Sequence, residues 1–231
     1  MKSVFISFLL LLLAITGMAQ RPGDVLPECR NAQEQRQLTA RFFTHQPIPD
    51  SVFRRMKGRS FGKDCTVKRS DLRYLLVLHR NKEGRTQVGE MVCNKAIASQ
   101  LIAIFKELYE GGYSIERMVL IDDYGADDER SMAANNTTCF NFRFMTGSRS
   151  RVSKHGMGLA VDINPLYNPY VKGGRVQPAA GRAYVKNRAK VPMAIQRGDL
   201  CHSLFLKHGF SWGGAWRSLK DYQHFELSIK Y

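Results

Sequence analysis

The chain has few acidic residues, no C-x-x-C motif and no long apolar run, and each shortage excludes a class of protein. Only 20 of its 231 residues are Asp or Glu, against 35 Lys or Arg, which gives a formal net charge of +15. None of the five cysteines lies in C-x-x-C, which argues against a cysteine-rich metal site. The basic residues form no helical stripe and match no nucleic-acid motif, so a specific nucleic-acid binder is not expected. The positive charge favours an anionic envelope polymer as a partner.

The longest apolar run, residues 5–15, is too short to span a bilayer, for which about 20 residues are needed. Lys2 precedes this run, and Gly17-Met18-Ala19 follows it as a small-x-small cleavage site. The arrangement predicts a secretory signal peptide over residues 1–19, and hence a secreted or periplasmic protein without a stable membrane anchor. In an oxidising compartment we expect one or two disulfides, with Cys29–Cys65 as one candidate pair and Cys201 as a buried, unpaired thiol.

The remaining sequence divides into an N-terminal strap and a main domain. Residues 20–66 are polar, Arg-rich and carry four prolines, and we interpret them as the strap, with the main domain at residues 67–231. Periodicity predicts strands at 72–78, 87–92, 118–121, 159–163 and 222–229, and helices at 95–109 and 200–208. Alternation at residues 140–144 predicts that the three phenylalanines of this segment face the core. The elements do not alternate strictly as β-α-β, so an α+β fold is predicted.

The segment S-K-H-G-M-G-L-A-V-D, residues 153–162, is the first candidate site. It places His155 and Asp162 seven residues apart, with two glycines that allow a tight bend between them. Asp162 lies between aliphatic residues of a predicted core strand, where its charge is costly unless something compensates it. A bound cation would do so directly. The alternative is that Asp162 caps a turn through Asn164-Pro165.

The segment D-Y-Q-H-F-E, residues 221–226, is the second candidate site. Two histidines and one carboxylate are a common ligand set for a catalytic zinc, whose fourth position stays open for water. His224 would complete that set, and a remaining carboxylate could act as the base. Asp221 and Glu226 both suit this role, and Glu226 could instead orient an imidazole. In the absence of a metal, the pair would be a surface Asp and a half-buried His.

Together, S-x-H-x-x-G-x-A-x-D and the downstream D-x-x-H-F-E resemble the zinc D-alanyl-D-alanine carboxypeptidases and L-alanyl-D-glutamate endopeptidases, which cut peptidoglycan stem peptides. N-F-R at residues 141–143, D-I-N-P-L-Y-N-P at 162–169 and W-G-G-A-W at 212–216 extend the resemblance. It covers the chain from Leu72 to the C-terminus. It implies a Hedgehog/DD-peptidase-like α+β fold, with a mostly antiparallel sheet flanked by helices, and makes residues 67–231 a zinc peptidase domain.

The resemblance also assigns roles to individual residues. It implies that His155, Asp162 and His224 bind Zn²⁺, and that Asp221, three residues before the last histidine, is the catalytic carboxylate in preference to Glu226. Arg143 matches the arginine that binds or polarises the substrate. We add three candidate substrate-binding residues from their positions, Ser153, Asn141 and Trp212. Ser153 could instead cap the turn, and Trp212 could instead pack in the core.

The expected function is that of a secreted zinc metallopeptidase that hydrolyses amide bonds in peptidoglycan stem peptides. It would act as an L-Ala-D-Glu endopeptidase or a D-Ala-D-Ala carboxypeptidase, and the W-G-G-A-W and D-I-N-P motifs favour the endopeptidase. The alternative is a cell-wall binding or signalling module with a structural or vestigial zinc site, because the same fold occurs in Hedgehog signalling domains.

Overall fold

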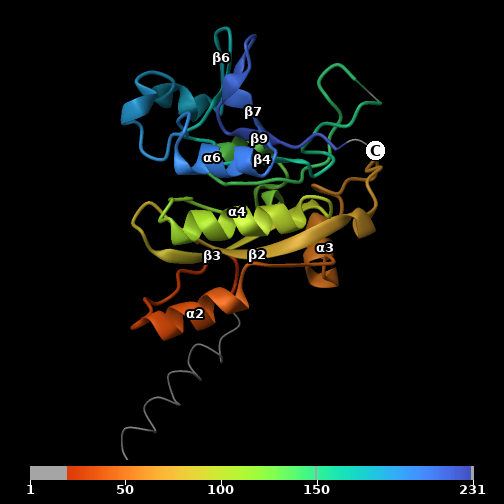
Figure 1. The fold of residues 1–231 in the computed structure, drawn as a ribbon. Coiled ribbons are helices and arrows are strands. Elements are labelled where there is room, and N and C mark those ends of the chain that lie inside the picture. Colours follow the sequence, from red (N-terminus) through yellow and green to blue (C-terminus); the bar gives the residue numbers. More distant parts are fainter. Residues whose placement is uncertain (1–19, 149, 230–231) are drawn as a thin grey trace, which may run out of the picture.

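The computed structural model describes residues 20–148 and 150–229. The predicted signal peptide, residues 1–19, lies outside these ranges. Within them, helices and antiparallel strands are stacked in layers, which confirms the predicted α+β class (Figure 1). None of the helices in these ranges is both long and apolar enough to cross a membrane.

The described residues form three small antiparallel sheets rather than one. The first has the order β1-β2-β3, the second β4-β9-β7 and the third β6-β5-β8. The strands are β1 (Thr44–Gln46), β2 (Leu72–Arg80), β3 (Thr86–Asn94), β4 (Ala160–Asp162), β5 (Tyr170–Lys172), β6 (Arg175–Gln177), β7 (Ser211–Trp212), β8 (Lys220–Asp221) and β9 (His224–Glu226). The α-helices are α2 (Ala32–Arg41), α3 (Asp50–Met56), α4 (Ala98–Glu110), α5 (Asp128–Ala133) and α6 (Leu200–Lys207). Short 3₁₀ helices are η1 (Arg69–Asp71), η2 (Ile121–Tyr124), η3 (Ala179–Tyr184), η4 (Arg188–Lys190) and η5 (Gly213–Ala215).

Helix α4 is the central layer of the molecule. It lies between the β1-β2-β3 sheet and the layer that contains α6, β4 and β9 (Figure 1). Leu101, Ile104, Phe105 and Leu108 recur at helical spacing and are all buried, as the sequence predicts. Because buried apolar area contributes roughly 25 cal/mol per Å², this helix stabilises the layers on both of its sides.

Strand β9 is anchored in the same core from the other side. Phe225 is fully buried and stacks on Phe205 of α6, with the ring centroids 4.2 Å apart. Its neighbours His224 and Glu226 therefore point to the opposite face of the strand. The packing of one phenylalanine thus sets the direction of two candidate site residues.

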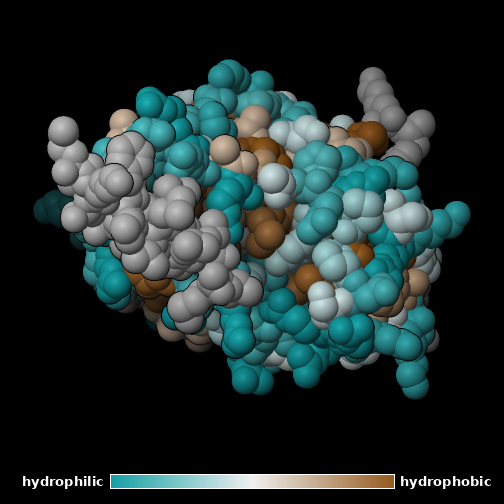
Figure 2. Space-filling view, turned by 90° about the horizontal axis from the view of Figure 1, so that it is seen from below, coloured by the Kyte–Doolittle hydropathy of each residue, from teal (hydrophilic) through white to brown (hydrophobic). Residues whose placement is uncertain are grey.

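The strap packs closely against the main domain. Gly23 N–H donates to the carbonyl of Val88, and β1 adds an edge strand to β2. Arg55 of α3 donates to both carboxylate oxygens of buried Glu90 on β3, at 2.9 and 2.6 Å. On the face seen from below, the visible described residues are mostly hydrophilic, with only small hydrophobic areas between them (Figure 2). The domain boundary at residue 66 stays a prediction.

Three local expectations are wrong. Residues 118–121 form no strand: the backbone hydrogen bond from Glu90 N–H to the Met118 carbonyl is not continued into a ladder with β3 before η2 begins. Of the three phenylalanines at residues 140–144, only Phe140 is buried, and the segment is irregular. All five cysteines lie in the described ranges and all are free, so the expected Cys29–Cys65 pair is not formed. Cys201 is buried, as predicted.

Candidate metal centre

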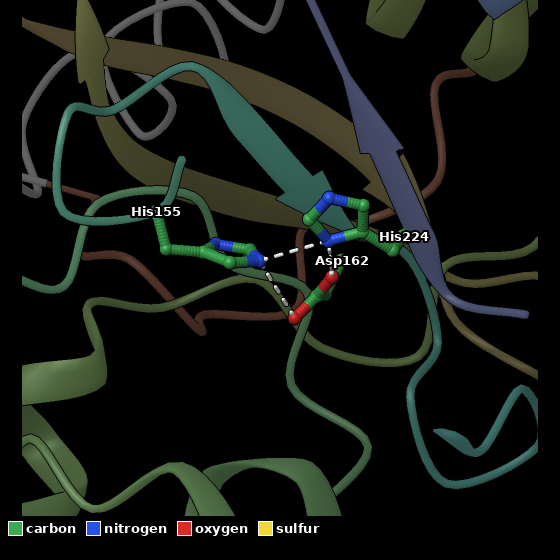
Figure 3. A group of neighbouring side chains, drawn as sticks. All are labelled: His155, Asp162 and His224. Carbon is green, nitrogen blue, oxygen red and sulfur yellow. Dashed lines mark hydrogen bonds and ion pairs between the residues drawn. The ribbon is translucent and has the colours of Figure 1, made fainter. Parts of the chain in front are cut away.

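Three predicted ligands come together at the β4–β9 pair. Asp162 ends β4 and lies directly opposite His224, the first residue of β9. Directly opposed residues of an antiparallel pair point to the same face, so the two side chains meet. His155 reaches the same point from the turn that precedes β4 (Figure 3).

The glycines of H-G-M-G allow this turn to lie flat against its neighbours. A Cβ on Gly156 would lie 2.6 Å from the carbonyl oxygen of Arg143, and one on Gly158 would lie 2.7 Å from the backbone nitrogen of Asn94. Gly158 also has a φ of +68°, which favours glycine. The Ser153 hydroxyl accepts a hydrogen bond from Gly156 N–H at 2.9 Å. This contact supports the turn-capping alternative for Ser153, and its substrate-binding role stays a prediction.

The ligand atoms are spaced as a small cation requires. His155 Nε2 lies 3.1 Å from His224 Nδ1 and 3.2 Å from Asp162 Oδ2, and His224 Nδ1 lies 3.2 Å from Asp162 Oδ1 (Figure 3). One atom from each residue lies within 4.8 Å of the others. Tetrahedral ligands about 2.0–2.1 Å from a zinc ion are separated by about 3.3 Å. The three side chains therefore fit one shared ion.

Each imidazole has one nitrogen that faces the centre, His155 Nε2 or His224 Nδ1, and one that faces away from it. The hydrogen bonds of the nitrogens that face away explain why the other two can bind a cation. His155 Nδ1 lies 2.7 Å from the Cys139 carbonyl oxygen, which can only accept a hydrogen bond. His224 Nε2 lies 3.1 Å from Glu226 Oε2, which places the proton of a neutral ring on that nitrogen. With both rings neutral, His155 Nε2 and His224 Nδ1 present lone pairs to the Asp162 carboxylate. Three acceptors that face one another need a positive charge between them.

The electrostatics of the group agree with this requirement. Burial disfavours the ionised Asp162, but attraction and hydrogen bonds from His155 and His224 hold the pKa of its carboxyl well below the usual range. Burial also opposes the charge on His224, yet hydrogen bonds to Asp162 and Glu226 raise the pKa of this imidazole to about 10. In the metal-free protein His224 thus carries a positive charge at neutral pH beside the ionised Asp162, and an entering metal ion would compete with the proton of His224.

Asp221 is a carboxylate beside the group with an oxygen that is not satisfied. Burial, reinforced by the charge of Asp162, raises the pKa of Asp221 to about 6. Its Oδ1 is buried and has no hydrogen-bond partner in the described part of the chain. Gly213 of η5 backs this position, because a Cβ there would lie 2.9 Å from Asp221 Cβ and 3.3 Å from His224 Cβ. A carboxylate of this kind is suited to accepting a proton.

Arg143 and Asn141 are held by α5 rather than by the three ligands. A guanidinium nitrogen of Arg143 lies 3.3 Å from Asp128 Oδ2, and the side chain is 38% exposed. Asn141 donates from its amide nitrogen to Asp128 Oδ1 at 2.9 Å and to the Ala126 carbonyl at 3.2 Å. Arg143 keeps an exposed edge for a ligand, whereas the amide nitrogen of Asn141 is engaged within the protein. Their substrate-binding roles stay predictions.

The two tryptophans of W-G-G-A-W have different surroundings. Trp212 is buried, donates its indole N–H to the Tyr222 carbonyl and stacks near Phe225, which favours the core-packing alternative. Trp216 is half-buried, and its ring centroid lies 5.4 Å from that of His224. The aromatic residue that borders the centre is thus Trp216. The spacing within W-G-G-A-W does not show which of Trp212 and Trp216 lies beside the centre.

Sequence reasoning also missed two groups that hold the site residues in place. The Cys139 carbonyl has no signature in a sequence, because any residue type supplies it. Asp128 is the first residue of α5 and belongs to an acidic run at residues 122–129 whose pattern names no partner. Its proximity to Arg143 depends on the path of the irregular segment 138–144, which periodicity does not give.

One comparison with known proteins finds a similarity that covers the two candidate motifs. Residues 146–227 match a family model described as D-alanyl-D-alanine carboxypeptidase. The matched segment is about a third of the chain and contains His155, Asp162, Asp221 and His224, but neither Arg143 nor Asn141. Searches of curated proteins and of solved structures found no match. The segment that carries both motifs is therefore similar to the D-alanyl-D-alanine carboxypeptidase family, as the resemblance of the two motifs predicts.

Proposed function

We propose that the protein is a secreted or periplasmic zinc metallopeptidase that hydrolyses amide bonds in peptidoglycan stem peptides. The family match supports a metallopeptidase at the level of the family. The observation that carries the proposal is the combination of three converging acceptors with Asp221, whose buried Oδ1 has no partner within the described ranges. Such a combination supplies a metal site and a base in one place.

Each member of the site has a distinct role in this proposal. His155, Asp162 and His224 would hold the zinc ion, which when bound supplies Lewis acidity toward the scissile carbonyl and lowers the pKa of a water molecule. The Cys139 carbonyl and Glu226 fix the orientations of the two imidazoles. Asp221 would accept the proton from the attacking water and pass it to the leaving amine, and burial helps it because it keeps the pKa close to neutrality.

Substrate binding would involve the groups at the margin of the centre. The exposed edge of the Arg143 guanidinium can bind a carbonyl or carboxylate of the peptide while Asp128 holds its other side. The half-buried ring of Trp216 offers an apolar wall beside His224. We retain the endopeptidase preference of the sequence motifs, with the L-Ala-D-Glu bond as the proposed target and D-Ala-D-Ala as its alternative.

A binding or signalling module with a structural zinc is the competing function. Structural zinc sites are closed by four protein ligands, whereas the described group offers three. A structural site also has no use for an unsatisfied, buried carboxylate, which is costly to maintain. Asp221 therefore favours the catalytic function.

The test is digestion of purified muropeptides by zinc-loaded protein, with the fragments identified by mass spectrometry. Wild type should release fragments cut within the stem peptide, and Asp221→Asn should bind zinc but lose about 100-fold or more of the rate. Asp64→Asn makes the same substitution at an exposed position and should leave the rate unchanged. Zinc-loaded wild type that leaves every muropeptide intact would refute the proposal, and release of D-Ala alone would refute the endopeptidase preference.

A further inference from the structure

The segment between β4 and α6 is a concentrated source of positive charge. Residues 163–198 contain seven Lys or Arg and no Asp or Glu. Arg188 is bound internally, to Asn168 Oδ1 at 2.7 Å and to the Ile195 carbonyl at 3.3 Å. The six others are exposed, and none forms an ion pair within the part of the chain that the structure describes. They are Lys172, Arg175, Arg182, Lys186, Lys190 and Arg197.

Three of these charges gather at the turn of the β5–β6 hairpin. Lys172 and Arg175 are directly opposite partners on either side of Gly173-Gly174. Arg182 reaches the same turn and donates to the Gly174 carbonyl at 3.2 Å. Like charges directly opposite each other destabilise a strand pair, so the hairpin maintains this arrangement against its own stability. Binding of an anion would relieve the repulsion.

Strand register relates this turn to the candidate base. In the β6-β5-β8 sheet, Tyr170 pairs with Asp221 of β8. Opposed residues share a face, and so do alternate residues of one strand. Lys172 therefore lies on the face that carries Asp221, and its partner Arg175 lies there too. Two residues along a strand correspond to about 7 Å, so Lys172 and Arg175 lie about 7 Å further along the sheet than Asp221, on the same face.

The hairpin is also placed where a ligand can approach it. It projects from the end of the molecule opposite α2 (Figure 1). Lys172 and Arg175 are both exposed, whereas Asp221 of β8, opposite the first residue of β5, is half-buried and has a buried Oδ1. An extended peptide that followed this sheet face would run from the buried centre to the exposed pair.

We propose that Lys172 and Arg175 form a subsite for a carboxylate that the substrate carries one to three residues from the bond that is cut. The proposal rests on the proposed peptidase function and specifies its substrate class as an acidic peptide. An extended peptide rises about 3.3 Å per residue, so the 7 Å spacing corresponds to about two residues. The carboxylate is either an acidic side chain of the stem peptide or its free C-terminus. A neutral peptide would gain nothing from this pair.

The test compares two charge-matched double variants of the zinc-loaded protein. The first is Lys172→Gln with Arg175→Gln, and the second, the control, is Lys186→Gln with Lys190→Gln in the same basic segment. The substrates are one synthetic stem peptide and its two derivatives, amidated at the acidic side chain or at the C-terminus. We expect the first variant to raise KM for the unmodified peptide about 5- to 10-fold with kcat little changed, and the control to match wild type. One amidated peptide should show the same rise in KM with wild type, which identifies the carboxylate.

Equal KM values for the two double variants would overturn the subsite, as would an unchanged effect of the first variant on both amidated peptides. Thermal unfolding of the control variant should match wild type, because Lys186 and Lys190 are exposed. The hairpin variant should be at least as stable as wild type, because it removes the repulsion between Lys172 and Arg175. If zinc-loaded wild type cleaves none of the peptides, the peptidase function fails separately. Peptide binding to Asp221→Asn, measured by fluorescence polarisation with and without the two hairpin substitutions, then decides the subsite alone.

Discussion

Asp162 Oδ1 lies 3.2 Å from His224 Nδ1 because the two residues are directly opposite partners in the β4–β9 pair. The chain separates them by 62 residues. One pair of short strands, held by the burial of Phe225, therefore fixes both the distance and the direction of two ligands. The third, His155, depends on a turn whose glycines lie against neighbouring backbone.

Removal of His155 should abolish tight zinc binding, since the remaining His224 and Asp162 offer only two ligands. We expect His155→Ala to lower the zinc content of purified protein from about one ion per chain to nearly none. Equilibrium dialysis followed by elemental analysis measures this. His45→Ala is the matched control, because the His45 side chain is exposed and its ring hydrogen-bonds to Ser99, away from the candidate centre. Equal zinc content in the two variants would contradict the assignment.

Glu226 should act on metal affinity through His224. Glu226→Gln weakens the hydrogen bond that holds His224 Nε2, so we expect zinc affinity to fall about 10- to 100-fold while the fold is retained. Competition with a chromophoric chelator measures the affinity. Glu28→Gln, at an exposed position, should have no effect. If Glu226→Gln binds zinc as tightly as wild type, then Glu226 does not orient the imidazole.

Asp221 should lower the stability of the metal-free protein at neutral pH. Its folded pKa of about 6 lies above the model-peptide value of 3.8, so the unfolded chain binds fewer protons between these values. The free energy of unfolding therefore falls as pH rises through this window, by at most about 1–3 kcal/mol. We expect chelator-treated Asp221→Asn to be more stable than wild type at pH 7 and equal to it near pH 3.

Urea unfolding at the two pH values measures the difference, with Asp64→Asn as the control. A variant that is less stable than wild type at pH 7 would show that Asp221 contributes to folding, and the raised pKa would then be wrong. The expected result combines greater stability with lost activity, which a purely structural carboxylate does not produce.

Gly156→Ala should destabilise the fold and the site together. The added Cβ would lie 2.6 Å from the Arg143 carbonyl oxygen and 2.7 Å from Val152 Cγ1, so backbone must shift. We expect a loss of about 1–3 kcal/mol in urea unfolding, with weaker zinc binding. Gly174→Ala meets no atom within 4 Å and should leave both quantities unchanged. Equal unfolding curves for the two variants would show that the turn accommodates a side chain.

The sequence singled out the three residues that come together at the centre better than it predicted the groups that hold them in place. His155, Asp162 and His224 stand in two motifs with fixed spacing, so their type and order were readable. Helix α4 was predictable from the helical spacing of its apolar residues, and α6 from its N-cap residue, Asp199. The pairing of β4 with β9 was not readable, because strands of three residues carry almost no pattern and the partners are far apart in the chain.

The burial and the neighbours of some residues depend on tertiary contacts and could not be predicted from the sequence. Nothing in the acidic run at residues 122–129 distinguishes Asp122 from its neighbours, yet Asp122 is buried and accepts hydrogen bonds from the backbone and hydroxyl of Ser60. Trp212 and Trp216 look equivalent in W-G-G-A-W, yet only one borders His224. In each case the partner comes from a segment that local periodicity does not connect to the residue.

The order of the ligands along the chain has a consequence for biosynthesis. His224 follows His155 by 69 residues and enters the fold on β9, after every other described strand. A nascent chain that has not yet been extended through this strand presents only two of the three donors. Binding of one ion by all three proposed ligands would therefore have to follow the synthesis of β9 and its pairing with β4.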